Sequence, residues 1–108
     1  MDGWYGKTPL YAAAANGHVA AVKALLKAGV NKEVADKYCW TALHAAARYG
    51  HEEAVLALLQ AGADKEAADK YCWTALHAAA RYGHEEAVLA LLQAGADKEA
   101  ADKVGAPG

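Results

Sequence analysis

The sequence DKYCWTALHAAARYGHEEAVLALLQAGADKEAA occupies residues 36–68 and recurs without a single change at residues 69–101. A diverged copy at residues 3–35 precedes them and keeps their Thr, Leu and Gly-His landmarks, and a fourth copy starts at Asp102 and stops within its first turn. Self-similarity at a fixed period of 33 residues is the signature of a repeat architecture, in which each unit stacks on its neighbours. The sequence therefore predicts a linear stack of small units.

Within one unit, the local signals predict two short helices and an extended connection. Thr41 is a good N-cap, and the Ala/Leu run after it ends at Tyr49-Gly50. A second helix follows at once, with two glutamates in its first turn, where carboxylates favour the helix dipole, and with Gly62 as its end. Its expected buried stripe consists of Val55, Leu58 and Leu59. A polar connection with a turn then leads to the next unit.

The 33-residue period, the Thr-Ala/Pro-Leu-His stretch, the Gly-His pair and the Ala-Gly-Ala-Asp segment resemble the ankyrin repeat over nearly the whole chain. The resemblance implies an all-α solenoid, a right-handed stack of antiparallel helix pairs with β-turn, hairpin-like loops along one edge. Residues 1–108 would then be a single ankyrin repeat domain. Its repeats would lie at 3–35, 36–68 and 69–101, with a partial fourth repeat or tail at 102–108.

Composition argues for tight packing of small side chains and against several kinds of partner. Apolar residues make up 56% of the chain, many of them Ala, and there is no Phe. The formal net charge is −2 without a basic stripe, so neither nucleic acid nor an anionic membrane is expected as a partner. Apolar runs such as Leu10–Ala15 are far too short to span a bilayer. We expect a cytoplasmic protein, or a soluble recombinant one if the sequence is synthetic.

No catalytic or metal-binding constellation stands out, and we expect a non-enzymatic protein without a cofactor. The threonines Thr8, Thr41 and Thr74 are helix caps rather than nucleophiles, and no phosphate-binding loop is present. The histidines recur in register as two sets, His44 and His77, and His18, His51 and His84. The family resemblance implies that they are structural and hydrogen-bond neighbouring loops and turns.

Cys39 and Cys72 stand at a turn position where the family usually has Gly. If the turn uses a positive φ, a residue with a Cβ is strained there, so either the turn has relaxed or these residues impose a small cost. Three interpretations are open: a substitution copied with its repeat, engineered thiols for labelling, cross-linking or metal capture between chains, and an internal disulfide. The disulfide is disfavoured, because neighbouring repeats should lie about 10 Å apart, beyond the roughly 7 Å limit of Cα separation.

The resemblance implies that the turn tips and the end of the first helix face a concave surface that contacts partners. On this chain those positions are Trp4, Tyr5, Lys7, Lys37, Tyr38, Trp40, Arg48, Tyr49, Lys70, Tyr71, Trp73, Arg81 and Tyr82. Tyr, Trp and Arg dominate interface hot spots, which favours a protein partner. In the alternative interpretation, Tyr38 and Trp40 stack on their equivalents in the next repeat and stabilise the array without a ligand.

The ends of the array carry no recognisable capping repeat, whereas solenoids usually close with polar caps. The last full copy has the same sequence as the copy that packs on it, so we expect homo-oligomers, end to end or as a symmetric pair, or through Cys39 and Cys72. Leu56 and Leu89 are expected to be exposed apolar side chains.

Identical copies and paired cysteines favour a designed or engineered protein over a recently duplicated natural array. The sequence thus predicts a non-catalytic scaffold that binds a protein through its concave loop-and-helix edge. The alternative is an engineered scaffold that self-assembles or carries functional cysteines and has no natural partner.

Overall fold

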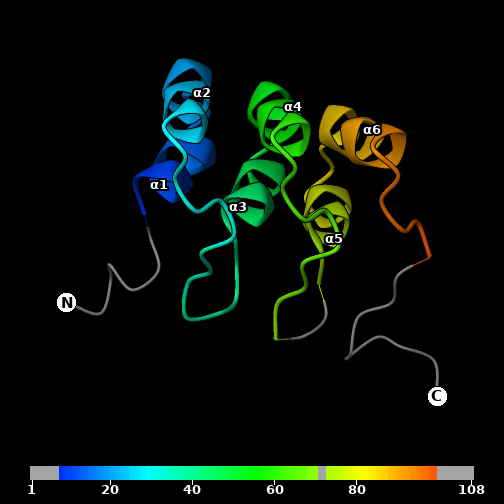
Figure 1. The fold of residues 1–108 in the computed structure, drawn as a ribbon. Helices are drawn as coiled ribbons and strands as arrows, with labels where there is room; N and C mark the ends of the chain where they lie inside the picture. Colours follow the sequence, from blue (N-terminus) through cyan, green and yellow to red (C-terminus); the bar gives the residue numbers. More distant parts are fainter. Residues whose placement is uncertain (1–7, 71–72, 100–108) are drawn as a thin grey trace.

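The computed structural model describes residues 8–70 and 73–99, which form six α-helices in three successive pairs (Figure 1). The helices are α1 (Pro9–Ala15), α2 (Val19–Lys27), α3 (Ala42–Arg48), α4 (Glu52–Gln60), α5 (Ala75–Arg81) and α6 (Glu85–Gln93). The first helices α1, α3 and α5 pack on one another in one layer, and α2, α4 and α6 form a second layer on top of it. The loops between pairs project from the side of the first layer (Figure 1). The predicted stack of helix pairs is confirmed.

The first helix of each pair starts at a threonine, as predicted. Thr8, Thr41 and Thr74 have extended backbones, and the hydroxyl of each accepts a hydrogen bond from the backbone N–H three residues later. In α3 the cap is reciprocal, because Nδ1 of His44 accepts from the N–H of Thr41 at 3.1 Å. Each such cap satisfies donors that a helix start would otherwise leave unpaired, an effect worth about 1 kcal/mol.

The turn inside each pair depends on glycine for two reasons. Gly50 has φ of +73°, a left-handed conformation that ends α3 and lets the N–H of His51 return to the carbonyl of Ala46 at 3.0 Å. A Cβ on Gly50 would also lie only 2.5 Å from Nδ1 of His84. Gly50 therefore ends α3 and also leaves room for the ring of His84 from the next repeat.

The core consists of small side chains from the first layer and of aliphatic side chains from the second. Every residue from Ala42 to Ala47 is at most 2% exposed, so α3 is enclosed on all sides by α1, α4 and α5. In α4, Val55 and Leu58 are fully buried and Leu59 is partly buried, as the stripe predicted. Alanine lets helix backbones approach closely, so many short contacts replace a few large anchors.

The two leucines predicted to be exposed differ. Leu89 on α6 is 45% exposed, as predicted, but the prediction was wrong for Leu56, which is partly buried against the core. The two residues have identical sequence surroundings. They differ because α6 packs against α4 and covers Leu56, whereas no described element packs on the far side of α6.

Histidines link each pair of helices to the previous one. Nε2 of His51 lies 3.0 Å from the carbonyl oxygen of Ala15, and Nε2 of His84 lies 2.8 Å from that of Arg48. These carbonyls belong to the ends of α1 and α3, which lack intrahelical partners. The structural role predicted for these histidines is confirmed.

The described loop between α2 and α3 closes as a tight hairpin-like turn. The carbonyl of Asp36 accepts from the N–H of Cys39, and the N–H of Asp36 donates to the carbonyl of Trp40, both at 2.8 Å. Cys39 has φ of +66° and is the one non-glycine residue with positive φ in the described ranges. The turn has therefore kept the conformation that favours glycine, and the Cβ of Cys39 strains the backbone there. Cys72 lies outside the described residues.

None of the helices in residues 8–70 and 73–99 has the length and apolar character needed to cross a membrane. The longest contain nine residues, and a bilayer requires about 20.

Replacing the strained cysteine should stabilise the protein. Because a left-handed backbone costs a residue with a Cβ about 1 kcal/mol, Cys39→Gly should raise the free energy of unfolding in urea by about that amount. Cys39→Ala is the matched control, since it removes the thiol but keeps the Cβ, and it should leave stability nearly unchanged. Equal effects of the two substitutions would contradict strain at this position.

Candidate functional site

The carboxylate of Asp36 organises the loop that carries Tyr38 and Trp40. Its Oδ1 accepts from the backbone N–H groups of Tyr38 at 2.8 Å and Trp40 at 3.0 Å. Its Oδ2 accepts from the hydroxyl of Tyr11 on α1 at 3.0 Å, so the previous repeat holds the same side chain. Burial, together with the charge of Asp36, raises the pKa of Tyr11 well above its ordinary value. Asp36 is only 8% exposed, and a buried carboxylate with three donors fixes the loop firmly.

Trp40 connects its own repeat to the loop of the next one. Its ring stacks on His44 with centroids 5.3 Å apart, and its Nε1–H donates to Oδ2 of Asp69 at 2.9 Å. Trp73 repeats the stacking on His77 at 5.7 Å. Among the described residues no ring contact joins Trp40 to Trp73, so the stacking of Trp40 on its counterpart is not realised. The counterpart of Tyr38, Tyr71, lies outside the described residues. The link between repeats is a hydrogen bond.

His44 makes the second link between these repeats and is buried, with 1% of its surface exposed. Its Nδ1 must accept, because the backbone N–H of Thr41 can only donate. The proton therefore resides on Nε2, which donates to the carbonyl of Trp73 at 2.9 Å. Burial lowers the pKa of His44 below its ordinary value, and the carbonyl of Trp73 offsets this in part. The ring is thus held neutral by its surroundings.

The guanidinium of Arg48 contacts three aromatic rings from two repeats. Arg48, at the end of α3, lies 5.6 Å from the ring centre of Trp40 and 5.2 Å from those of Tyr49 and Tyr82. Tyr49 and Tyr82 remain 51% and 46% exposed. Each cation–π contact at such a site is worth about 0.5–1 kcal/mol. The two tyrosines are therefore held in place while half of each stays accessible.

A second group of cations surrounds the tip of the loop. Nζ of Lys37 lies 5.3 Å and Nζ of Lys70 lies 5.5 Å from the ring centre of Tyr38, which is 50% exposed. Lys70 belongs to the following loop, so this tyrosine also joins two repeats. At the far end, Arg81 lies 6.0 Å from the ring centre of Tyr82.

We call the residues of these two groups the aromatic edge: Lys37, Tyr38, Trp40, Arg48, Tyr49, Lys70, Arg81 and Tyr82. The structure brings these sequence-predicted positions together, with Trp73 in the following loop. Trp4, Tyr5, Lys7 and Tyr71 lie outside the described residues. Sequence reasoning missed Asp36 and Asp69, although an Asp two residues before the turn tip is a typical signal of a side chain that binds its own backbone.

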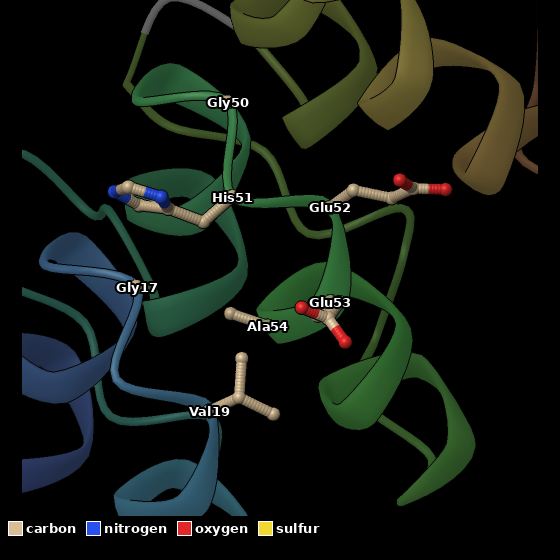
Figure 2. A pocket seen from close by; sticks show the side chains of 7 residues that line it. All are labelled: Gly17, Val19, Gly50, His51, Glu52, Glu53 and Ala54. Carbon is tan, nitrogen blue, oxygen red and sulfur yellow. The ribbon is translucent and has the colours of Figure 1, made fainter.

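A small hollow of about 240 Å³ lies at the inner turns, lined by Gly17, Val19, Gly50, His51, Glu52, Glu53 and Ala54. Figure 2 shows the ring of His51 on the side of Gly17 and the carboxylate of Glu52 extending in the opposite direction. His51 also binds the carbonyl of Ala15. These polar groups do not converge on one point, so the hollow offers no acid–base pair.

The described residues contain no group of three or more potential metal ligands. Cys39 is exposed and free, and its counterpart Cys72 is outside the described ranges. One thiol alone is a poor metal site, since structural zinc takes four ligands.

A fold of stacked helix pairs, joined by tight loops and by histidine-to-carbonyl hydrogen bonds, defines a helical repeat protein. A family profile described as Ankyrin repeats (3 copies) matches residues 1–69 and again residues 35–102. The chain therefore belongs to the ankyrin repeat family. Members of this family generally act as protein–protein interaction modules and are typically not enzymes. No curated protein matches the chain in a sequence comparison.

Stability should fall as His44 is forced to ionise. Because its pKa is lowered in the folded state, the unfolded chain binds the additional proton, and stability decreases as the pH falls from above about 6.5. Urea unfolding at pH 7.5 and 5.5 should show this loss in the wild type. His44→Gln should be less stable overall but should lose less between the two pH values. An unchanged pH dependence would contradict a depressed pKa at His44.

Trp40 and Tyr49 should respond differently to alanine substitution. Trp40→Ala removes a half-buried ring and leaves Asp69 without its indole donor, so we expect a loss of about 2 kcal/mol in unfolding free energy. Tyr49→Ala removes a half-exposed ring and its cation–π contact with Arg48, and it should cost about 0.5–1 kcal/mol. Thermal and urea unfolding followed by circular dichroism measure both. If Trp40→Ala is as mild as Tyr49→Ala, the bridge to Asp69 contributes little.

Proposed function

We propose that this chain binds a protein partner through the aromatic edge. The observation that carries the proposal is the position of Arg48 among the rings of Trp40, Tyr49 and Tyr82, with two of these rings half exposed. Tyr and Arg are the residue types most enriched among interface hot spots. Their fixed placement supports binding, because side chains that are already ordered lose little entropy when a partner docks.

Trp40 has a different role from the tyrosines in this proposal. Its indole N–H and ring face are engaged by Asp69 and His44, so it supports the frame on which the exposed residues stand. The rings that offer surface to a partner are Tyr38, Tyr49 and Tyr82.

The charge of the aromatic edge indicates the chemistry of the partner. Its charged side chains, Lys37, Arg48, Lys70 and Arg81, are all cationic, whereas the whole chain has a net charge of −2. A partner that presents carboxylates around an apolar centre fits this pattern, since opposite charges at the rim steer association and select the partner.

The test is selection of binders from a phage-displayed peptide library, followed by affinity measurements on variants. Peptides enriched on the wild type should be rich in Asp and Glu. They should bind the double variant Tyr49→Ala with Tyr82→Ala at least about tenfold more weakly, a loss of about 1.4 kcal/mol.

Glu53→Ala with Glu86→Ala is the matched control, because both glutamates are exposed on the second helices, away from the loops. This control should bind the peptides as the wild type does. Peptides that bind the tyrosine variant and the wild type equally, or no enrichment at all, would refute binding through the aromatic edge.

A further inference from the structure

The two identical repeats reveal which residues a neighbouring repeat covers. Because residues 36–68 and 69–101 have the same sequence, a difference in exposure between equivalent residues reports only what packs on them. Leu43 is 2% and Ala47 is 0% exposed, whereas on α5 their counterparts Leu76 and Ala80 are partly exposed and exposed, respectively. The side chains uncovered in this way on the last described repeat are Leu76, Ala80, Val88, Leu89 and Leu92. We call these five residues the trailing face.

The first described repeat shows the complementary pattern on its opposite side. Ala12, Ala21 and Ala24 are exposed and Leu25 is partly exposed. Their equivalents on the middle repeat, Ala45, Ala54, Ala57 and Leu58, are 1%, 0%, 7% and 0% exposed, because the first repeat covers them. We call Ala12, His18, Ala21, Ala24 and Leu25 the leading face.

The leading face has kept the residues that make internal contacts. The first repeat differs from the others at many positions, yet at the five positions of the leading face it carries the same residue as the middle repeat. Four other positions that are more exposed in the first repeat than in the middle one carry a different residue: Pro9, Tyr11, Lys23 and Val30 stand where the middle repeat has Ala42, His44, Leu56 and Ala63. The five residues of the leading face therefore offer a repeat with the sequence of residues 69–101 the same side chains that the middle repeat offers to the first.

A hydrogen bond from a histidine ring to a backbone carbonyl joins each repeat to the previous one. The first described repeat has a histidine without such a partner, and the last has the space that a histidine would fill. Internally, the ring of His84 lies against Gly50 and its Nε2 reaches the carbonyl of Arg48 at 2.8 Å. At the trailing end, no atom of the described residues lies within 4 Å of the Cβ position of Gly83. At the leading end, His18 is exposed, and its backbone hydrogen-bonds to Ala13 and Val22 whereas its ring makes no hydrogen bond to a described residue.

We propose that a second copy of this chain stacks head to tail on the first. The leading face of one copy packs on the trailing face of the other, the ring of His18 enters the space beside Gly83, and its Nε2–H donates to the carbonyl of Arg81. This contact repeats the geometry by which His51 binds Ala15 and His84 binds Arg48. The interface between copies is thus a continuation of the interface between repeats, and it is heterologous.

Two other occupants of the trailing face fit less well. A symmetric pair would place leucines against leucines and Gly83 opposite Gly83, with no histidine to fill the space. Residues 102–108 lie outside the described residues and align with residues 36–42, the turn and the first residue of α3. Residues 3–9 of an incoming copy align with the same seven positions.

The test uses two variants, and each variant carries a substitution that disrupts only one of the two faces. Sedimentation equilibrium of the wild type from about 10 μM to about 1 mM, where weak interfaces become populated, should show an average mass that rises steadily with concentration. Leu89→Lys with Leu92→Lys blocks the trailing face, and His18→Ala weakens the leading face. Each variant alone should associate at least about tenfold more weakly than the wild type.

An equimolar mixture of the two variants is the decisive sample. Each variant retains the face that the other lacks, so the mixture should form one-to-one dimers and no larger species. A symmetric pair predicts instead that His18→Ala associates like the wild type and that mixing restores nothing. Either that result, or a wild type that stays monomeric throughout, would overturn the proposal.

Two controls keep the result interpretable. Glu86→Gln on the exposed surface of α6, outside the trailing face, should associate as the wild type does. Circular dichroism should show unchanged helix content in every variant, and Ala24→Glu replaces His18→Ala as the leading-face variant if the latter unfolds.

Discussion

Close contact between short, alanine-rich first helices is the constraint on which the rest of the structure depends. Four of the seven residues of α3 are alanines, and the helix is buried from Ala42 to Ala47 because α1 and α5 flank it and α4 packs on it. At this size a single pair would expose most of its apolar surface, so each unit is stable only within a stack. The loops and the aromatic edge take their positions from this packing.

Hydrogen bonds between repeats convert that packing into a fixed spacing. Asp36 receives donors from its own loop and from Tyr11 of the previous repeat. Trp40 and His44 then reach forward to the next loop. Dispersion contacts between alanines are not directional, whereas hydrogen bonds have defined lengths and angles. The polar links therefore set the register in which Arg48 meets rings from two repeats.

The proposed binding surface and the proposed association between copies follow from different consequences of repetition. Along the aromatic edge, repetition brings together residues from neighbouring units, so that Arg48 contacts both Tyr49 and Tyr82. At the two ends, repetition exposes surfaces that are complementary, because each was built to pack against a copy of the other. The first consequence supports recognition of a different protein and the second supports recognition of the same chain.

The sequence by itself determined the architecture. The period, the capping threonines and the glycine after Tyr49 are local signals whose effect depends on a few adjacent residues, and they placed all six described helices. The positions that form the aromatic edge came from the family resemblance, and the sequence left open whether the turn at Cys39 had relaxed or was strained.

Only the tertiary structure decided what individual side chains do. Leu56 and Leu89 have the same sequence neighbours, yet one is covered and the other is exposed. Trp40 fits equally well, on sequence, as a partner contact or as a stacking residue, and the structure shows its indole bound to Asp69. Burial and hydrogen bonding depend on atoms that are distant in sequence, and a periodic sequence does not state which neighbour is present. The identical units therefore acquire different roles from their place in the stack.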